Sequence, residues 1–154
     1  HRDAEVMVLE VGDEITEIET LLPDGVTRLL LTYGAQTSGY RLAQASFQRL
    51  DCIVVDGRQA SDAETAEPCL LDLDLDECGH WWMSRVDDGV VLTDPDSGHS
   101  LILRNFDGQR PLLLMLPIAG RPHTFTLAQG LEAFATVRGA EATVSLTAVI
   151  AALR

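Results

Sequence analysis

The stretch LLDLDLDECGHWW, residues 70–82, alternates leucine with aspartate and then ends in two adjacent tryptophans. In a β-strand, residues two apart share one face, so a period of two separates a core face from a water face. The stretch therefore predicts a strand that buries its leucines and exposes its acids. The buried side would hold Leu71, Leu73 and Leu75, and the water side would hold Asp72, Asp74 and Asp76.

Further strand patterns lie on both sides of this stretch, separated by turn residues. The expected strands cover residues 5–11, 26–34, 52–57, 90–93, 100–106 and 111–116. Near the end the period changes, and a helix is predicted between an N-cap at Thr126 and a C-cap at Gly139. A second helix is expected from Ser145. Residues 1–154 should thus form a single, mainly β domain, a sandwich-like or β-roll-like antiparallel meander with one or two short C-terminal helices.

The charge of the chain excludes some classes of partner. The 154 residues carry a formal net charge of −13, and all eleven basic residues are arginine. Such a chain repels phosphate backbones and anionic lipid, so nucleic acid and membrane surfaces are poor partners. The longest apolar run begins at Pro111, is interrupted by Pro117, and is too short to span a bilayer. We expect a protein or host-surface partner instead.

Two acidic patterns raise the question of a calcium site. Carboxylates along one face of a strand lie roughly 6.5–7 Å apart, too far to share one ion, so Asp72, Asp74 and Asp76 are interpreted as a solvated face. The segment TDPDSGHS, residues 93–100, resembles the start of a calcium loop at Asp94 and Asp96. Its glycine and its twelfth residue do not match that loop, which favours a hairpin turn. Calcium at these two aspartates stays open as an alternative, and no other cofactor is predicted.

The three cysteines, Cys52, Cys69 and Cys78, form no CxxC pair and match no zinc spacing. Free cysteines are usually small buried hydrophobic residues, and the apolar strand surroundings of Cys52 and Cys69 predict inert thiols. Cys78 and His80 are the one close pair that could supply a nucleophile and a base. An enzyme that depends on a cysteine and a histidine is therefore one alternative function.

The two tryptophans are the strongest candidates for binding. Trp81 and Trp82 are adjacent, so in a strand their side chains point to opposite faces. One should enter the core, and the other should be exposed unless a partner or a helix covers it. An exposed tryptophan on an acidic strand is a natural interface anchor. The candidate binding residues are Trp81, Trp82, Asp72, Asp74 and Asp76.

Residues 12–34, GDEITEIETLLPDGVTRLLLTYG, and residues 81–108, WWMSRVDDGVVLTDPDSGHSLILRNFDG, resemble β-rich segments of large secreted bacterial toxins of the repeats-in-toxin or giant pore-forming kind. The resemblance implies a non-catalytic structural or binding module that serves delivery, receptor contact or scaffolding. It also implies secretion, with delivery into a host cell in some cases, and contact with other domains of a parent chain. The start at His1 is typical of a fragment. The glycine-rich calcium nonapeptide of that family is absent, so its calcium sites are not carried over to any residue.

One further alternative follows from the charge. A small acidic protein of the immunity or chaperone type would neutralise a basic partner, and its charge would steer the association.

Overall fold

The structure is a computed structural model that describes residues 5–10, 15–18, 24–33, 39–57, 68–87, 89–106 and 111–153. Within these residues, twelve strands and three helices follow one another: β1 (Glu5–Glu10), β2 (Ile15–Glu17), β3 (Val26–Thr32), β4 (Gly39–Ala43), α1 (Gln44–Arg49), β5 (Cys52–Asp56), β6 (Cys69–Asp74), β7 (Trp82–Val86), β8 (Gly89–Thr93), β9 (Ser100–Arg104), β10 (Leu112–Ile118), β11 (Arg121–Thr126), α2 (Leu127–Arg138), β12 (Thr143–Ser145) and α3 (Leu146–Ala151). The mainly β class with short C-terminal helices is confirmed.

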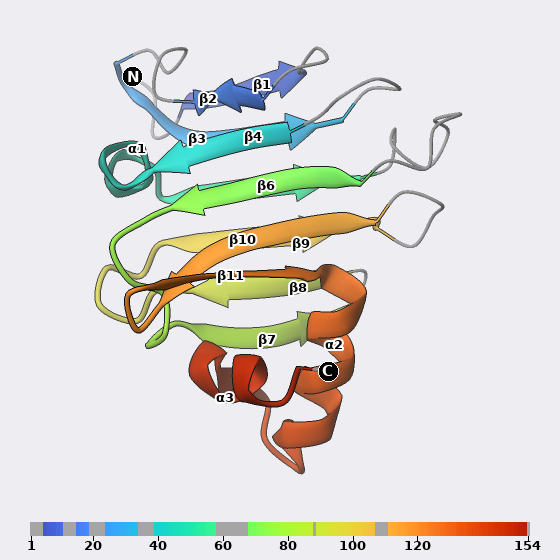
Figure 1. The fold of residues 1–154 in the computed structure, drawn as a ribbon. Coiled ribbons are helices and arrows are strands. Elements are labelled where there is room, and N and C mark those ends of the chain that lie inside the picture. The colour runs from blue at the N-terminus through green and yellow to red at the C-terminus, as the bar shows by residue number, and fades with distance from the viewer. Residues whose placement is uncertain are drawn as a thin grey trace.

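The strands form two sheets, which lie one in front of the other in Figure 1. Sheet A has seven strands in the order β1-β3-β5-β9-β8-β7-β12, and sheet B has five in the order β11-β10-β6-β4-β2. From β1 to β6 the chain changes sheet at every strand. Neighbours in each sheet are therefore alternate strands of the chain, and they pair in parallel.

The expected antiparallel meander is found over part of the chain only. Strands β7, β8 and β9 pair in sequence and antiparallel, as do β10 and β11. Elsewhere the prediction of strand direction is wrong, because β1 to β6 and the pairs β5–β9 and β6–β10 are parallel. The physical reason is that consecutive early strands face each other across the core instead of bonding edge to edge.

The core lies between the two sheets and is filled from alternate strand positions. The predicted period of two in residues 70–76 is confirmed: Leu71, Leu73 and Leu75 are buried, and Asp74 and Asp76 are exposed. Asp72 is half-buried. Sheet A meets this leucine layer with its own inward residues, namely Leu29, Leu31, Ile53, Val55, Leu101 and Leu103.

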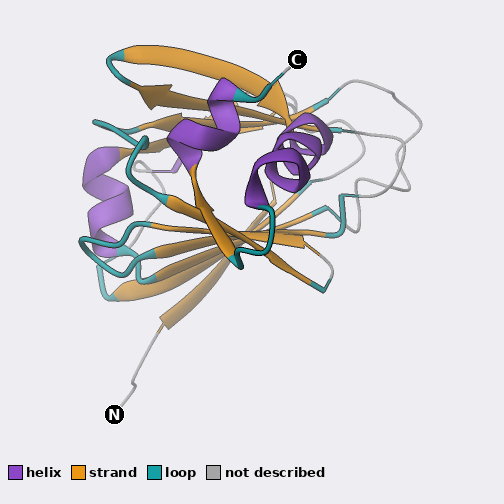
Figure 2. Ribbon diagram, turned by 90° about the horizontal axis from the view of Figure 1, so that it is seen from below, coloured by secondary structure: helices purple, strands orange, loops and turns teal. Residues whose placement is uncertain are grey.

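Helices α2 and α3 close one end of the sandwich. Seen from that end in Figure 2, α2 and α3 lie between the sheet layers, and α2 contacts β10 and β11 of sheet B as well as β12 of sheet A. The predicted caps are confirmed, because Thr126 forms a capping box with Gln129 and α2 ends at Gly139. The predicted start of the second helix is confirmed at Ser145, which caps α3. Among the described residues, no helix is both long enough and apolar enough to cross a membrane.

Candidate functional site

The connection between β6 and β7, residues 75–81, is held at its centre by Glu77. The Glu77 carboxylate accepts hydrogen bonds from the backbone N–H of Ala119, at 2.9 and 3.1 Å, and of Gly79, at 2.9 Å. Ala119 and Gly120 have φ values of 56° and 76° and form the tight turn between β10 and β11. The bond from Ala119 is the main reason that the pKa of Glu77 lies below its ordinary value, although burial opposes the shift. Glu77 is thus a structural acid that ties this connection to the turn.

The same connection also anchors α3. The Gly79 carbonyl accepts from the Thr147 hydroxyl at 2.8 Å, and the Trp81 carbonyl accepts from the Leu146 N–H at 2.9 Å. These bonds fix the backbone on both sides of His80. The His80 side chain is therefore presented from a rigid segment to the neighbouring turn.

That neighbouring turn joins β8 to β9, and the predicted hairpin is confirmed there. The Asp94 carboxylate accepts from the Asp96 N–H and from the Ser97 hydroxyl, both at 3.0 Å, and the Asp94 carbonyl accepts from the Gly98 N–H at 2.8 Å. Side-chain acceptance of this kind is how aspartate stabilises turns. The main role of Asp94 is therefore to stabilise this turn.

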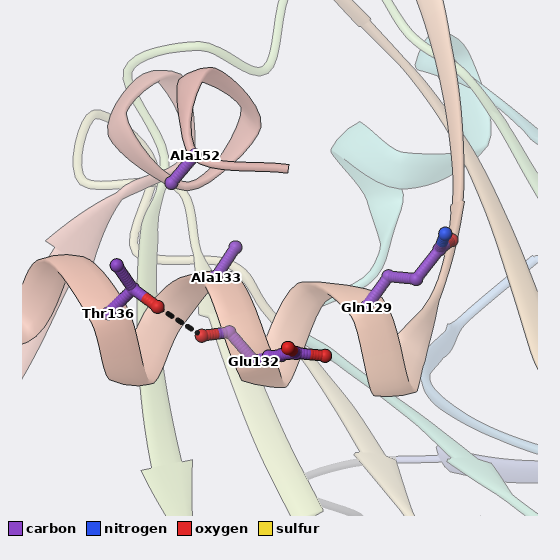
Figure 3. A pocket seen from close by; sticks show the side chains of 5 residues that line it. All are labelled: Gln129, Glu132, Ala133, Thr136 and Ala152. Atoms are coloured by element: carbon purple, nitrogen blue, oxygen red, sulfur yellow. Dashed lines mark hydrogen bonds between the residues drawn. The ribbon is translucent and has the colours of Figure 1, made fainter. Parts of the chain in front are cut away.

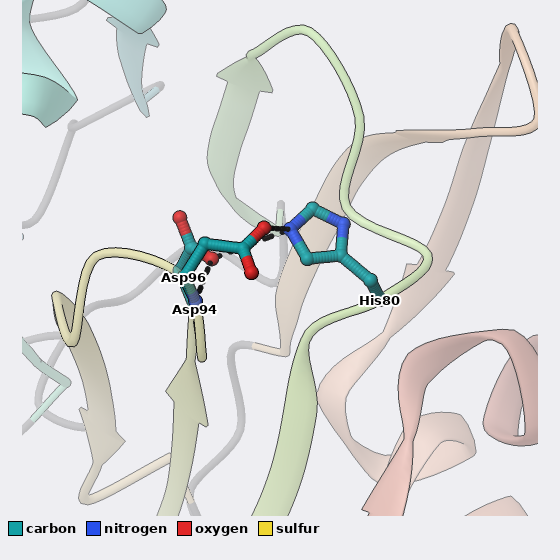
Figure 4. A group of neighbouring side chains, drawn as sticks. All are labelled: His80, Asp94 and Asp96. Atoms are coloured by element: carbon teal, nitrogen blue, oxygen red, sulfur yellow. Dashed lines mark hydrogen bonds and ion pairs between the residues drawn. The ribbon is translucent and has the colours of Figure 1, made fainter.

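His80 joins the two segments (Figure 4). Its Nε2 atom lies 3.3 Å from Asp94 Oδ1 and 3.3 Å from Asp96 Oδ2. The Asp94 side chain is 15% exposed, whereas that of Asp96 is 83% exposed. Burial acts to raise the pKa of Asp94, but the hydrogen bonds from Asp96 and Ser97, together with the charge and hydrogen bond of His80, outweigh it and lower that pKa.

These residues line a small cavity of about 210 Å³, which we call the acidic pocket. Its walls are Gln44, Phe47, Asp76, Glu77, His80, Trp81, Asp94 and Asp96. The rings of Phe47 and Trp81 stack at 5.0 Å between centroids with 25° between their planes. Four carboxylates, one imidazole and two aromatic rings therefore meet at one place.

The acidic pocket gathers five of the residues singled out in the sequence, Asp76, His80, Trp81, Asp94 and Asp96. The sequence alone does not place Gln44 and Phe47 in this pocket. Both residues belong to α1, and Gln44 lies 32 positions before Asp76. No local pattern links α1 to residues 76–96. The sequence pattern suggests His80 only as a partner of Cys78. The spacing of residues along the sequence does not predict the contact of His80 with the turn between β8 and β9.

The other predicted binding residues lie elsewhere. Asp72 is on the outer face of sheet B, where its Oδ2 pairs with Arg41 Nε at 2.9 Å, and Asp74 follows it at the exposed end of β6. The expectation that the two tryptophans point to opposite sides is confirmed: Trp81 is 2% exposed and Trp82 is 42% exposed. Only Trp82 of the two offers its side chain to a partner, on the outer face of sheet A.

The chemistry of a cation at this place can be judged from the donor types. His80, Asp94 and Asp96 each offer one ligand atom within 4.8 Å of the others. One nitrogen and two carboxylates suit zinc-like transition ions better than calcium, which takes six to eight oxygens. Calcium at Asp94 and Asp96 stays a prediction.

Cys78 does not have the properties of a nucleophile. Its side chain is fully buried, and burial raises the pKa of the thiol to about 12, helped by the charges of Glu77 and Asp94. The thiol therefore stays protonated at neutral pH, and the reactive form of a cysteine is the thiolate. His80 faces Asp94 and Asp96, so this pair does not provide an activated thiol.

A second pocket lies between α2 and α3 (Figure 3), lined by Gln129, Glu132, Ala133, Thr136 and Ala152. The Thr136 hydroxyl donates to the Glu132 carbonyl at 3.0 Å. This bond stays within one helix and is common for threonine. The groove is explained by the packing of the two helices.

A comparison with models of protein families and with curated proteins finds no match to this chain. The geometry of the acidic pocket is therefore the basis for a function.

Asp94 should contribute to stability in a pH-dependent way. We expect Asp94→Ala to lower the free energy of unfolding by about 1–2 kcal/mol at pH 7, because two hydrogen-bond donors of the turn lose their acceptor. Since the folded-state pKa of Asp94 lies below the ordinary value of 3.8, its contribution is present above that value and is lost as the pH falls through the folded pKa. Urea unfolding of wild type and variant from pH 7 downward through that range measures both effects.

The matched control is Asp96→Ala, which removes an exposed carboxylate that contacts His80. This change should cost less than about 0.5 kcal/mol, as is usual for an exposed ion pair. An equal or larger loss in the control would contradict the assignment of the effect to the hydrogen bonds that Asp94 accepts in the turn.

Proposed function

We propose that this chain is a non-catalytic binding module of a larger secreted bacterial protein of the toxin or effector kind. Its acidic pocket takes up a basic side chain of a protein partner. The observation that carries the proposal is the meeting of Asp76, Glu77, Asp94 and Asp96 around one small cavity. Four carboxylates gathered in this way attract a guanidinium or ammonium group.

The size of the pocket supports a side chain over a larger cofactor. Its volume of about 210 Å³ is smaller than the roughly 300–1,000 Å³ of pockets for drug-sized ligands. Asp76 and Asp96 are exposed, and in the described part of the chain no side chain bonds to the carboxylate of Asp76. These two acids are therefore accessible to an incoming cation, whereas Glu77 and Asp94 are held by backbone bonds.

The net charge supports the same partner. A chain with a net charge of −13 attracts basic groups and repels acidic ones. This long-range electrostatic attraction acts mainly on the rate of association. Arginine fits best among the basic side chains, because its planar fork can bond to two carboxylates at once.

The test uses a defined probe, the peptide acetyl-Gly-Arg-Gly-amide, with the uncharged citrulline analogue beside it. We expect the arginine peptide to shift the backbone NMR signals around residues 76–81 and 94–98, and the citrulline peptide to leave them in place. The double variant Asp76→Asn/Asp96→Asn should weaken binding about tenfold, equivalent to about 1.4 kcal/mol.

The control is the double variant Asp74→Asn/Asp87→Asn, which removes the same charge from exposed positions outside the pocket. It should change the dissociation constant less than about twofold, because exposed charges that do not line the pocket act weakly. Equal weakening by both double variants would assign the effect to net charge and contradict the pocket.

The same pocket supports a second candidate, a small acidic protein of the immunity or chaperone type that neutralises a basic partner. The two candidates differ in their genes. A long reading frame on both sides of this segment favours the module, and a short gene beside that of a basic toxin favours the neutralising protein.

A further inference from the structure

The outer face of sheet A, opposite the core, carries a row of apolar side chains. Strand register places Leu30, Val54, Ile102 and Val91 side by side on β3, β5, β9 and β8. All four are half-buried, and therefore still reach the surface. Cys52 and Trp82 stand in the register row on one side of these four, and Val86 stands in the row on the other side. We call these seven residues the apolar face.

The apolar face carries little charge for a protein with 24 acidic residues. Asp56 is the one acid among the outward positions of the described strands β3, β5, β9, β8 and β7. Its carboxylate pairs with Arg104 Nε at 3.0 Å and accepts from Asn105 Nδ2 at 2.9 Å. Arg28 stands at the opposite end of the same strands. The surface is thus neutral to slightly basic on a strongly acidic molecule.

We propose that the apolar face is where two copies of this chain pack together, sheet against sheet. Apolar sheet faces stack about 10 Å apart with their strands nearly aligned. Two copies of charge −13 repel each other in most orientations, and this face brings together two surfaces that each carry one acid, Asp56, on the five strands. A strongly basic partner fits it poorly, because Arg28 and Arg104 would repel such a partner.

The strand order supports a symmetric arrangement. β9 is the central strand of the five, between β5 and β8. Consider a twofold axis that lies between the two stacked sheets and runs parallel to β9. This axis places β3 of one copy over β7 of the other, because the two strands are equally far from β9. Arg28 and Trp82 are at the same height along the strands, because residues paired on neighbouring strands connect them. The connecting residues are Cys52, Ser100 and Thr93. Each Arg28 therefore meets the partner's Trp82, a pairing that cations and indole rings favour.

The area indicates a weak dimer. Five strands at about 4.8 Å spacing and five residues at about 3.3 Å rise cover roughly 400 Å² in each copy. Stable interfaces bury about 800 Å² per partner, and smaller ones are transient. The dimer should therefore form reversibly, with a dissociation constant on the order of 100 μM.

Sedimentation velocity of the whole chain tests the proposal, between about 5 and 500 μM protein and at about 50 and 500 mM NaCl, a range that spans strong and weak screening. We expect a concentration-dependent dimer that becomes several-fold tighter at high salt, because salt screens the repulsion between like-charged copies. Basic partners in the acidic pocket should show the opposite salt dependence. A chain that stays monomeric throughout, or a dimer that weakens with salt, would overturn the proposal.

Two valines provide matched variants, because Val86 on the apolar face is 37% exposed and Val137 on α2 is 36% exposed. Val86→Glu should weaken the dimer at least tenfold, and Val137→Glu, which adds the same charge elsewhere, should change it less than twofold. Circular dichroism and thermal midpoints establish that both variants fold. Equal weakening of the dimer by the two glutamates would place the interface elsewhere. The pocket variant Asp76→Asn/Asp96→Asn should dimerise like the wild type, whether or not it loses peptide binding.

Discussion

Replacing Trp81 with alanine is expected to lower the free energy of unfolding by about 3–5 kcal/mol, the range found for large aromatic residues removed from a core. The side chain is 2% exposed and stacks on Phe47 at 5.0 Å. Its removal opens a cavity where β7, α1 and the acidic pocket meet. Urea or thermal unfolding measures the loss.

The neighbouring tryptophan is the control for this prediction. Trp82 is 42% exposed, so Trp82→Ala should cost less than about 1 kcal/mol, because surface substitutions leave the core intact. A comparable loss at both positions would contradict the assignment of one indole to the core and the other to the surface. The milder variant Trp81→Phe keeps the protein folded if alanine does not, and should cost less than Trp81→Ala.

Gly89→Ala is expected to destabilise the fold by about 3 kcal/mol or more, because a close-packed backbone cannot accept the added methyl group. A Cβ atom at Gly89 would overlap the Leu103 carbonyl oxygen and would lie 2.9 Å from the Arg104 Cα atom. Both atoms belong to the backbone of β9. The hairpin of β8 and β9 would have to separate at this end.

Gly98→Ala is the control for this glycine. Gly98 has a φ of +78°, and a Cβ atom there has no neighbour within 4 Å in the described part of the chain. The cost should be only about 1 kcal/mol, the conformational penalty of a left-handed residue. Denaturant midpoints of the two variants give the comparison, and a loss at Gly98 as large as at Gly89 would show that contact with β9 is not the cause.

Local chemistry accounts for the parts of the fold that the sequence predicts well. The alternation in residues 70–76 determines which side chains are buried, because a strand has a period of two wherever it lies. The turn at residues 94–98 and the caps at Thr126 and Ser145 likewise depend on bonds between near neighbours. Such bonds form whatever the rest of the chain does.

Strand pairing and the acidic pocket depend on contacts that no local pattern encodes. Leu42 is paired with Leu73, and Val54 with Ile102, although nothing in either segment distinguishes a parallel partner from an antiparallel one. The pocket likewise needs Phe47 of α1 beside Trp81. The toxin resemblance and the predicted partners stay predictions that binding experiments and the parent gene can test.

The alternation of β1 to β6 between the two sheets has a consequence for the order of folding. A parallel pair such as β3 and β5 forms only after the intervening chain has crossed to the other sheet and returned, so loop-closure entropy opposes its early formation. Strands β7 to β9 and the β10–β11 hairpin close much shorter loops. The nucleus is expected to form in this C-terminal half, with the parallel strands adding to it one after another, and the N-terminal strands would then unfold first.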